Sequence, residues 1–317
     1  MRAQLHTDWR DIPSEARGCV AALGNFDGVH LGHAHLVHTV RQTRPEEPLA
    51  VVTFEPHPRE LFRPQDPPFR LTLAEERFSA LAALGVRHVF QIRFDQTFSE
   101  MPAERFVDDV LHEALGLKHI ACGQDFAFGH RRGGNTDFLA DRAGELGMGF
   151  TLVPAFCDAS GPYSSSRIRR LLQDGYPERA GSELGRPWSI RGVVQHGDKR
   201  GRILGFPTAN VPLGRHLEPA RGVYAVTVRL ANGQTHFGVA NIGRRPTIND
   251  GSECRLEANL FDFSGDLYGQ TISVALHSLL RNEKKFDSLD ALKEQIARDA
   301  EQARRVLAAE QAAHISG

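Results

Sequence analysis

The spacing of apolar residues changes half-way along the chain, and this change constrains the fold more than any other feature of the sequence. In the first half, short apolar runs alternate with helical patterns. We expect strands at residues 19–23, 49–54, 87–92, 118–122 and 149–153. We expect helices from about residue 32 and over residues 72–84, 102–115 and 136–146. Thr72 and Glu75 have the spacing of a capping box at the start of the second helix. This order predicts a mostly parallel sheet covered by helices, with ligands beyond the carboxyl ends of its strands.

The second half lacks this alternation. Its strand-like runs cover residues 188–195, 223–230, 236–242, 255–261 and 271–279. Turn residues separate several of these runs, and Asn232-Gly233 is a dipeptide typical of tight hairpins. Short strands without crossover helices predict an antiparallel barrel. A helical pattern from about Ser288 closes the chain. We therefore expect two domains, at residues 1–183 and 184–317.

Length and composition agree with a soluble two-domain protein. The chain has 317 residues, enough for two separate cores. Lys and Arg total 38 and Asp and Glu total 39, and the formal net charge of -1 argues against a protein dedicated to nucleic acid. The four cysteines are scattered without a CxxC pair, which is typical of free thiols in a reducing compartment. Because we find neither an apolar leader nor a stretch of membrane-spanning length, we expect a cytoplasmic protein.

A glycine-rich segment, GNFDGVHLGH at residues 24–33, directly follows the first predicted strand. Gly24 and Gly28 let the backbone approach a phosphate group, and the N-terminus of the next helix favours an anion. His30 and His33 lie at the start of that helix, where imidazoles stabilise charge on a phosphoryl group in transfer. This HxGH spacing indicates an adenylyl-transferring site. The alternative is a structural glycine turn with incidental histidines, since the chain has 15 His.

Three later segments end strands or begin helices, so they belong at the same edge of the sheet. They are TFEPHP at residues 53–58, GQDFAFG at 123–129 and SSSRIR at 164–169. The serines can cap a helix, and Arg167 can hold phosphate oxygens. The candidates for contact with a planar ring or for lining a pocket are Phe54, His57, Phe126 and Phe128. Core packing is an equal alternative for each of these phenylalanines.

A second glycine-rich and basic loop lies in the predicted barrel. HGDKRGR at residues 196–202 precedes GFPTAN at 205–210, and a loop of this kind can surround phosphates. Thr208 and Asn210 offer neutral oxygen ligands that suit Mg²⁺. The segment is not a Walker A loop, because it lacks the GK[ST] ending. A solvated surface turn is the alternative.

These motifs, in this order, resemble those of the bacterial bifunctional riboflavin kinase/FAD synthetases. GNFDGVHLGH, TFEPHP, GQDFAFG and SSSRIR resemble the four signature segments of the FMN adenylyltransferase module, although Ser166 stands where the family usually has Thr. GFPTAN, NIGRRPT at 241–247, DLYG at 266–269 and RNEKKF at 281–286 resemble the riboflavin kinase module. The resemblance implies a Rossmann-like nucleotidyltransferase domain, followed by a Greek-key antiparallel β-barrel with a C-terminal helix.

The resemblance also implies the site residues. The catalytic residues of the adenylyltransferase are His30 and His33, and its ATP and phosphate contacts are Gly24, Phe26, Asp27, Gly28, Ser164, Ser165 and Arg167. Its flavin contacts are Phe54, His57, Asp125, Phe126 and Phe128. The ATP and flavin contacts of the kinase are Gly197, Arg202, Gly205, Phe206, Pro207, Asn241 and Arg281, with Thr208 and Asn210 at the metal. The implied catalytic residue of the kinase is Glu257 in RLEAN, where Asn259 replaces a His common in the family.

The two reactions need different groups. The phosphate of FMN is already ionised near neutral pH, so its adenylylation by ATP needs positioning and charge neutralisation rather than a base. The 5′-hydroxyl of riboflavin is a poor nucleophile, and its phosphorylation benefits from a carboxylate base, here Glu257. The expected ligands are riboflavin, FMN, FAD, ATP and Mg²⁺. We expect no nucleic-acid or membrane partner, and a monomer or weak homo-oligomer.

Two alternatives stay open. A monofunctional FMN adenylyltransferase would use the barrel only to bind flavin or ATP, and incubation with riboflavin, ATP and Mg²⁺ separates it from a bifunctional enzyme. The second alternative is a nucleotide-binding domain fused to a barrel that binds RNA. The near-neutral charge and the lack of an aromatic and basic stripe argue against it, whereas strongly salt-dependent RNA binding would favour it.

Overall fold

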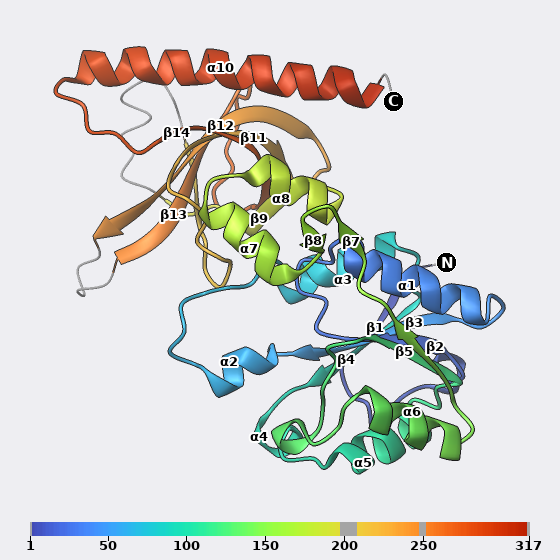
Figure 1. Ribbon diagram of the computed structural model, residues 1–317. Helices are drawn as coiled ribbons and strands as arrows, with labels where there is room; N and C mark the ends of the chain where they lie inside the picture. The colour runs from blue at the N-terminus through green and yellow to red at the C-terminus, as the bar shows by residue number, and fades with distance from the viewer. Residues whose placement is uncertain (1, 197–207, 247–251, 316–317) are drawn as a thin grey trace. The chain divides into compact units, whose positions relative to one another are not determined.

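The computed structural model describes residues 2–196, 208–246 and 252–315. Contacts within the chain divide it into two units, residues 1–67 with 72–164 and residues 68–71 with 165–317 (Figure 1). Each unit has a six-stranded sheet with an apolar core. None of the helices in the described ranges has the length and apolar character of a membrane span.

The first unit is built on a parallel sheet. Its strands are β1 (Gln4–His6), β2 (Val20–Leu23), β3 (Leu49–Glu55), β4 (His88–Arg93), β5 (His119–Gly123) and β6 (Gly149–Val153). They lie in the order β1-β4-β3-β2-β5-β6, and every neighbouring pair is parallel. The five strands predicted for this half are confirmed within one residue at each end. Strand β1 was not predicted, because three residues with mostly exposed side chains carry no apolar pattern.

Helices cover both faces of this sheet. Helices α1 (Leu31–Thr43) and α3 (Ala74–Ala83) pack on one face, whereas α5 (Ala103–Arg105), the adjoining η2 (Phe106–Ala114) and α6 (Thr136–Glu145) pack on the other (Figure 1). Successive side chains of a strand point to opposite faces. Val20 and Ala22 therefore pack with α1, and Ala21 and Leu23 pack with η2 and α6. The shorter elements are η1 (Ser14–Ala16), α2 (Pro58–Phe62), α4 (Gln96–Ser99), η3 (His130–Arg132) and the hairpin of β7 (Cys157–Asp158) and β8 (Gly161–Pro162).

Two expectations about these helices need correction. The helix expected at residues 102–115 is present, but its η2 part is a π-helix, and an apolar period near 3.6 does not reveal i→i+5 hydrogen bonds. Helix α3 is capped by Leu73 rather than by Thr72. The backbone N–H of Leu73 donates to the carboxylate of Glu76 at 2.7 Å, one residue further along than the predicted pair.

The second unit contains the antiparallel barrel. Its strands are β9 (Trp188–Val193), β10 (Ala209–Pro212), β11 (Gly222–Arg229), β12 (Thr235–Pro246), β13 (Ser252–Leu260) and β14 (Thr271–Asn282). They lie in the order β10-β13-β12-β11-β14-β9, and a bridge between Gln195 and Asn210 joins the two outer strands. The predicted barrel is therefore confirmed, with β10 as a strand that had not been predicted.

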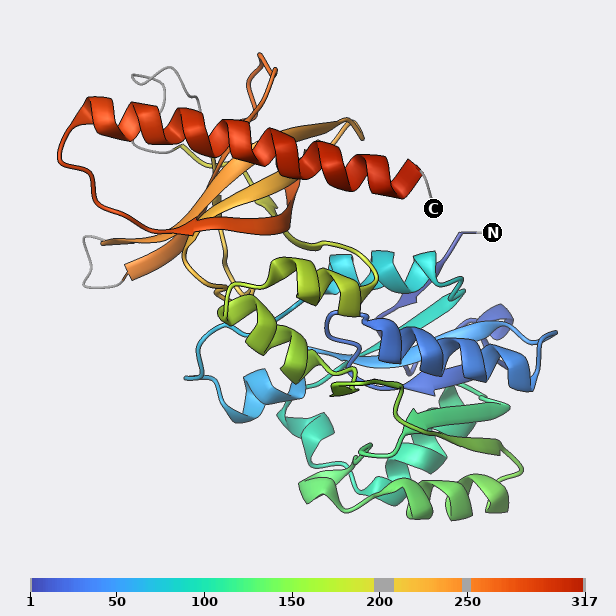
Figure 2. The same ribbon diagram turned by 45° about the horizontal axis from the view of Figure 1, so that its top comes forward.

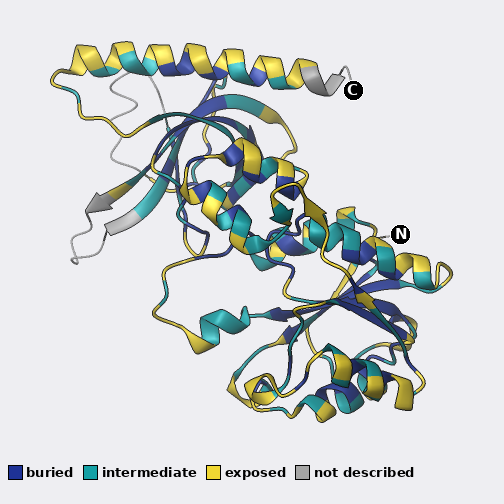
Figure 3. Ribbon diagram, in the orientation of Figure 1, coloured by how far each residue is buried: buried dark blue, intermediate teal, exposed yellow. Residues whose placement is uncertain are grey.

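The C-terminal helix α10 (Leu289–Ile315) covers the outside of the barrel (Figure 2). Tyr224 and Val226 of β11 lie in the barrel core, whereas Val223 and Ala225 of the same strand pack against α10 through residues such as Ala303. The strands are largely buried, and the side of α10 that faces away from the barrel is exposed (Figure 3). This arrangement confirms the predicted helix.

Helices α7 (Ser165–Gln173) and α8 (Pro177–Leu184) belong to the second unit, together with residues 68–71. Ile168, Leu172 and Leu71 are part of the barrel's apolar core. The indole Nε1–H of Trp188 donates to the carbonyl oxygen of Leu71 at 2.8 Å. Contacts thus divide the chain after Ser164, whereas the sequence-based domains meet at residues 183 and 184. The assignment of one activity to each domain is a separate matter and stays a prediction.

Candidate active sites

The loop between β2 and α1 has a strained backbone. Phe26 and Val29 have φ angles of 52° and 44°, in the left-handed region that side chains with a Cβ rarely adopt. Gly28, with φ 87°, lies between them. Each such residue costs on the order of 1–3 kcal/mol, so the surrounding structure must hold the loop in place. Backbone strain of this kind is concentrated at functional sites.

His30 and His33 cap the N-terminus of α1 reciprocally. The N–H of His33 donates to Nδ1 of His30, and the N–H of His30 donates to Nδ1 of His33, each at 3.3 Å. The two rings stack with centroids 3.7 Å apart. Because Nδ1 is the acceptor in both rings, the proton of each neutral imidazole belongs on Nε2. The structure therefore pairs the two predicted catalytic histidines at a helix end that favours anions.

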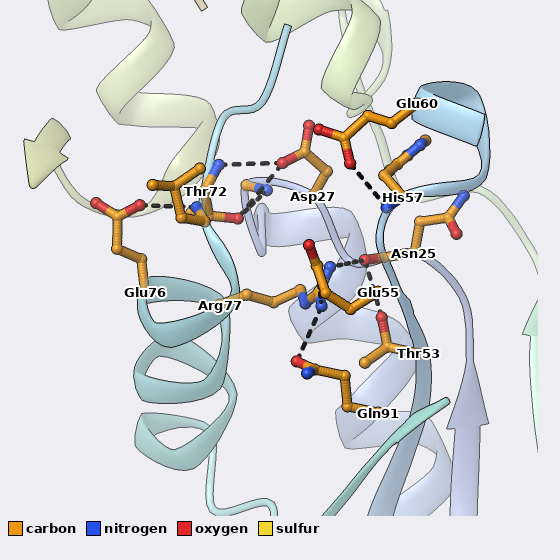
Figure 4. Close-up of polar contacts among 12 residues, drawn as sticks. Asn25, Asp27, Thr53, Glu55, His57, Glu60, Thr72, Glu76, Arg77 and Gln91 are labelled. Atoms are coloured by element: carbon orange, nitrogen blue, oxygen red, sulfur yellow. Dashed lines mark hydrogen bonds and ion pairs between the residues drawn. The ribbon is translucent and has the colours of Figure 1, made fainter. Parts of the chain in front are cut away.

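Asp27 supports this loop from inside. Its side chain is 2% exposed, and Oδ1 accepts from the backbone N–H of Thr72 at 3.0 Å and from its hydroxyl at 3.4 Å (Figure 4). The hydroxyl of Thr72 in turn accepts from the N–H of Gly28 at 2.9 Å. Among the predicted phosphate contacts, Asp27 is thus placed to hold the loop through Thr72. Sequence reasoning did not identify Thr72 as part of the site.

A buried arginine links the same loop to the end of β3. Arg77, 1% exposed, forms an ion pair with Glu55 at 2.9 Å and donates to Gln91 at 3.2 Å. Its Nη1 also donates to the carbonyl oxygen of Asn25 at 3.5 Å, and the hydroxyl of Thr53 donates to the same oxygen at 3.1 Å (Figure 4). The carboxyl end of β3 and the loop after β2 are therefore held together, as expected for neighbouring parallel strands.

The residues after β3 form a short capped helix. Nδ1 of His57 accepts from the N–H of Arg59 at 3.1 Å, and the N–H of His57 donates to Glu60 at 3.0 Å. Phe54 is buried among other phenylalanines, so little of its ring is available to a ligand. Phe62 is 62% exposed and packs edge-on against Phe94, with ring centroids 5.8 Å apart. Sequence reasoning missed this exposed ring, because Phe62 lies outside the four motifs and outside every predicted strand and helix of this half.

The three predicted flavin contacts in the segment after β5 differ in how far they are buried. Asp125 is exposed, Phe126 is half-buried and Phe128 is buried, with the two rings stacked at 5.5 Å. Arg131 and Arg132 follow in the exposed short helix η3, with φ angles of 52° and 59°. Two consecutive left-handed arginines are a second feature that the sequence pattern did not reveal.

The SSSRIR segment begins at the mouth of α1 and continues into the second unit. Tyr163 lies at α1, since a Cβ built on Gly32 would be 3.2 Å from its carbonyl oxygen, and Ser164 is the next residue. Ser165 and Arg167 open α7, which belongs to the second unit. Nε of Arg167 is 2.6 Å from Oε1 of the buried Glu183. This carboxylate offsets the charge of the arginine and fixes its direction.

Four of the predicted kinase residues lie in one row across the barrel. Asn210 of β10 is paired with Glu257 of β13, Glu257 with Asn241 of β12, Asn241 with Val223 of β11, and Val223 with Arg281 of β14. Directly paired residues of antiparallel strands present their side chains on the same face. The neighbours of Glu257, Leu256 and Ala258, lie in the barrel core, so this cross-strand row lies on the opposite face, towards α10.

The amide of Asn210 is suited to a cation. Asn210 is 5% exposed, and its Oδ1 has no hydrogen-bond partner among the residues that the structure describes. Its Nδ2 donates to the carbonyl oxygen of Thr208 at 3.4 Å. An unsatisfied buried oxygen costs about 1–3 kcal/mol, and a hard cation such as Mg²⁺ would satisfy it. The predicted metal residues therefore fit the group.

Gly197, Arg202, Gly205, Phe206 and Pro207 lie outside the described residues. Arg281, by contrast, is well placed at the end of the row, where it forms an ion pair with Asp299 of α10. Asp299 is a partner that sequence reasoning missed, because an acidic residue in a polar helix gives no sign of burial.

Two protein-family models match consecutive parts of the chain. The family model for FAD synthetase matches residues 12–167, and the model for riboflavin kinase matches residues 184–307. Among curated proteins, the bifunctional riboflavin kinase/FMN adenylyltransferase of Escherichia coli K12 is 44% identical over 284 residues, which cover 89% of this chain and 90% of that protein. Its counterpart in Pseudomonas fluorescens is 43% identical over 96% of this chain and 98% of that protein, and the one in Bacillus subtilis is 37% identical over 93% and 94%.

One solved structure matches over nearly the whole length. It is a crystal structure from Streptococcus pneumoniae described as a macrolide-efflux protein. It covers 96% of this chain and 99% of its own, with a TM-score of 0.85 and 33% identity. The likeness supports the arrangement of a parallel α/β sheet followed by an antiparallel barrel with a long C-terminal helix.

Proposed function

The chain belongs to the family of bifunctional riboflavin kinase/FMN adenylyltransferases, and on that premise we propose how its residues divide the two reactions. Its activities are riboflavin kinase and FMN adenylyltransferase, which act in FAD biosynthesis. We assign the adenylyltransferase to the mouth of α1 and the kinase to the cross-strand row. The single observation that carries this division is that His30 and His33 pair at the start of α1 in the first unit, whereas four predicted kinase residues lie in one row across the barrel of the second.

In the adenylyltransferase reaction, an oxygen of the FMN phosphate attacks the α-phosphorus of ATP, and pyrophosphate leaves. No proton has to be removed, because the attacking phosphate is already ionised. His30 and His33 donate through Nε2–H to the phosphoryl oxygens, which supports the charge that develops there. Their reciprocal capping supports this role, because it directs both Nδ1 atoms towards the helix.

The other predicted residues of this site supply binding. The backbone of Gly24, Phe26 and Gly28 surrounds the phosphates, and Asp27 keeps that backbone in place. Ser164, Ser165 and Arg167 complete the ATP contacts. The flavin contacts are His57, Asp125, Phe126 and the edges of Phe54 and Phe128, to which we add the exposed ring of Phe62. An exposed aromatic ring at the end of a short capped helix suits stacking on a planar ligand.

In the kinase reaction, Glu257 accepts the proton of the riboflavin 5′-hydroxyl while the oxygen attacks the γ-phosphorus of ATP and ADP leaves. Asn241 and Arg281 lie in the same row and contact the substrates, together with Gly197, Arg202, Gly205, Phe206 and Pro207. Thr208 and Asn210 would hold Mg²⁺, which offsets phosphate charge when bound. The buried, unsatisfied oxygen of Asn210 supports this part of the proposal within the described residues.

We also propose that the enzyme works in the cytoplasm as a monomer or weak homo-oligomer, on flavin and ATP as small-molecule substrates. All four cysteines are free thiols. Burial raises the pKa of Cys19, Cys122 and Cys254 to about 12, so these three stay protonated and unreactive near neutral pH. Light scattering on the purified enzyme measures the oligomeric state.

Two variants test the division of residues. Glu257→Gln keeps the shape of the side chain but removes the base, so FMN formation from riboflavin should fall by about 10²-fold or more. His30→Asn keeps a residue that caps helices but removes the imidazole, so FAD formation from supplied FMN should fall by about 10²-fold. Each reaction is followed by chromatography of the flavins.

Each variant is the control for the other. Glu257→Gln should convert supplied FMN to FAD at the wild-type rate, and His30→Asn should phosphorylate riboflavin at the wild-type rate. Loss of both reactions in either variant would contradict the division. Failure of the wild-type enzyme to make FMN would contradict the kinase activity itself and leave a monofunctional adenylyltransferase.

A further inference from the structure

Arg281, at the end of the cross-strand row, is held by a carboxylate of the C-terminal helix. Nε of Arg281 donates to Oδ1 and Oδ2 of Asp299 at 3.1 and 3.0 Å, and Nη2 is 2.9 Å from Oδ2. This bidentate contact fixes both the position and the plane of the guanidinium group. A single helical residue thus determines where the last side chain of the row points.

Asp299 is itself buried and supported. Its side chain is 4% exposed, and Oδ1 also accepts from Nε2 of Gln295 at 2.8 Å. A buried carboxylate is stable only with a charged partner and further hydrogen bonds, and both are present. The next residue, Ala300, belongs to the apolar cluster that contains Val223 of the row. Asp299 therefore reaches Arg281 from the turn of α10 that lies over the row.

Three of the five N–H groups of Arg281 are used within the protein. Nε–H and one N–H of Nη2 bind Asp299, and one N–H of Nη1 donates to the carbonyl oxygen of Asn282 at 3.1 Å. Two N–H groups are left without a partner in the part of the chain that the structure describes. The carboxylate offsets the positive charge, so these donors suit a neutral oxygen acceptor as well as a phosphate.

We propose that Asp299 is a positioning residue of the riboflavin kinase reaction, which directs Arg281 towards a ring carbonyl oxygen of riboflavin. The inference rests on the proposed function, because it takes the cross-strand row as the kinase site. It assigns α10 a role in flavin binding beyond covering the barrel. Asp299 acts through Arg281 and does not touch the reacting atoms.

The chain offers a matched control on the same helix. Oε2 of Glu310 on α10 lies 2.5 Å from Nδ1 of His277 on β14, so this pair also joins the helix to the barrel through a carboxylate. His277 lies outside the row, since the row residue of β14 is Arg281. Glu310→Gln therefore weakens the docking of the helix and leaves the row intact.

The test compares the kinase constants of Asp299→Asn, Glu310→Gln and wild type in the full-length enzyme. Asp299→Asn should raise KM for riboflavin about tenfold, with kcat and KM for ATP changed less than twofold. Glu310→Gln should keep all three constants within twofold of wild type. In a double-mutant cycle, Arg281→Lys combined with Asp299→Asn should be no worse than the more damaging single change, because both remove one interaction.

Several results would overturn the inference. Equal effects of Asp299→Asn and Glu310→Gln would mean that Asp299 only anchors the helix. A rise in KM for ATP instead of riboflavin would show that Arg281 faces the nucleotide. If Asp299→Asn does not fold, Gln295→Met removes only the support of Oδ1, and an unchanged KM for riboflavin would then reject the role.

Failure of the proposed function gives a different pattern. If Glu257→Gln retains full kinase activity, the row is not the kinase site, whatever Asp299→Asn does. If Glu257→Gln loses FMN formation while Asp299→Asn is unchanged, only the inference about Asp299 fails. Conversion of supplied FMN to FAD, measured on each preparation, shows that the first unit is intact.

Discussion

Thr72 illustrates how a single residue can support the loop between β2 and α1 from a distance in the sequence. Its backbone N–H and hydroxyl both donate to Asp27, and its hydroxyl accepts from the N–H of Gly28. These contacts hold the segment in which Phe26 and Val29 have strained backbones. The loop proposed to surround the phosphates therefore depends on this side chain as well as on Thr53 and Arg77, which donate to Asn25.

Replacement of Thr72 by Val tests this dependence, because Val has the same shape without the hydroxyl. The N–H of Gly28 then loses its buried acceptor, which should lower the free energy of unfolding by about 1–3 kcal/mol. Conversion of FMN to FAD should fall about tenfold, while phosphorylation of riboflavin stays within twofold of wild type. Urea denaturation and flavin chromatography measure the two effects.

Thr39→Val is the matched control. The hydroxyl of Thr39 on α1 donates only to the carbonyl oxygen of His35 in its own helix. This variant should retain both activities. An unaltered rate of FAD formation in Thr72→Val would show that the loop keeps its form without the hydroxyl.

The sequence was informative about residue types and much less so about their partners. The motifs identified His30, His33, Glu257 and Asn210 as candidates, and the structure brings the two histidines together and pairs Glu257 with Asn210. Thr72 was expected to cap α3 because local spacing cannot detect Asp27, 45 residues away. The burial of Asp299 likewise depends on how α10 packs, which no pattern along the helix records.

At the scale of secondary-structure elements, apolar runs were sufficient to predict most strands, but two short strands were missed. The strands of both sheets followed from their apolar runs, except β1 and β10, which have three and four residues. Strand β1 has mostly exposed side chains and β10 has polar Asn210 and a Pro among its four residues, so neither carries a clear apolar run, whereas the four residues of β2 are all apolar. Strand order and register, which create the cross-strand row, depend on pairing between distant segments.

The pairing of β1 with β4 brings two histidines together and makes the first unit sensitive to acid. Nε2 of His6 is 3.1 Å from Nδ1 of His88, which is fully buried. Burial first, and then the neighbouring His6 and Arg87, lower the pKa of His88 to about 4 from its ordinary value of 6.5. His88 therefore stays neutral in the folded form at pH values below about 6.5, at which the same side chain is protonated in the unfolded chain.

The stabilisation from an uncharged His88 is fully present above pH 6.5 and is lost progressively as the pH falls towards 4. The total loss should be on the order of 3 kcal/mol, from the difference between the two pKa values. Denaturant unfolding of wild type and His88→Phe between pH 7.5 and pH 4 measures it. The variant, which has no titrating ring here, should have a smaller slope.

Replacement of an exposed histidine provides the comparison. His38→Gln on α1 should keep the wild-type dependence of stability on pH, because the side chain is exposed in the folded form. If His88→Phe and His38→Gln have the same slope as wild type, the acid sensitivity arises elsewhere in the protein.

At the scale of the whole molecule, the two units are not consecutive pieces of chain. Residues 68–71 come from between α2 and α3 of the first unit, yet Leu71 lies in the barrel core with Ile168 and Leu172. Thr72, the next residue, supports the loop between β2 and α1 in the first unit. Neither the family models nor a linear division of the sequence reveals that the second unit contains this segment.

Two leucines of equal burial test which unit each belongs to. Leu71 and Leu81 are both fully buried, Leu71 in the barrel core and Leu81 in the core of the first unit. Replacement of either by Ala should cost about 2–5 kcal/mol. On heating, Leu81→Ala should lose FAD formation at a lower temperature than riboflavin phosphorylation. Leu71→Ala should lose riboflavin phosphorylation no later than FAD formation, because Ser165 and Arg167 on α7 belong to the same unit as Leu71.

Residual activities after heating steps, assayed separately for the two reactions, give the order of loss. If Leu71→Ala loses FAD formation first, residues 68–71 stabilise the first unit rather than the barrel. If both variants lose both activities together, the two units unfold as one.

The position of residues 68–71 also has a consequence for protein synthesis. Leu71 leaves the ribosome 117 residues before Trp188, whose indole binds its carbonyl group. At ordinary rates of bacterial translation this interval is roughly 6 to 23 s. During that time the first unit can fold, but the apolar residues 68–71 stay without their barrel partners, because the barrel has not yet been synthesised. A pause at rare codons between these positions would prolong the exposure of residues 68–71. The rate of translation therefore affects how long this apolar segment is exposed to aggregation during synthesis.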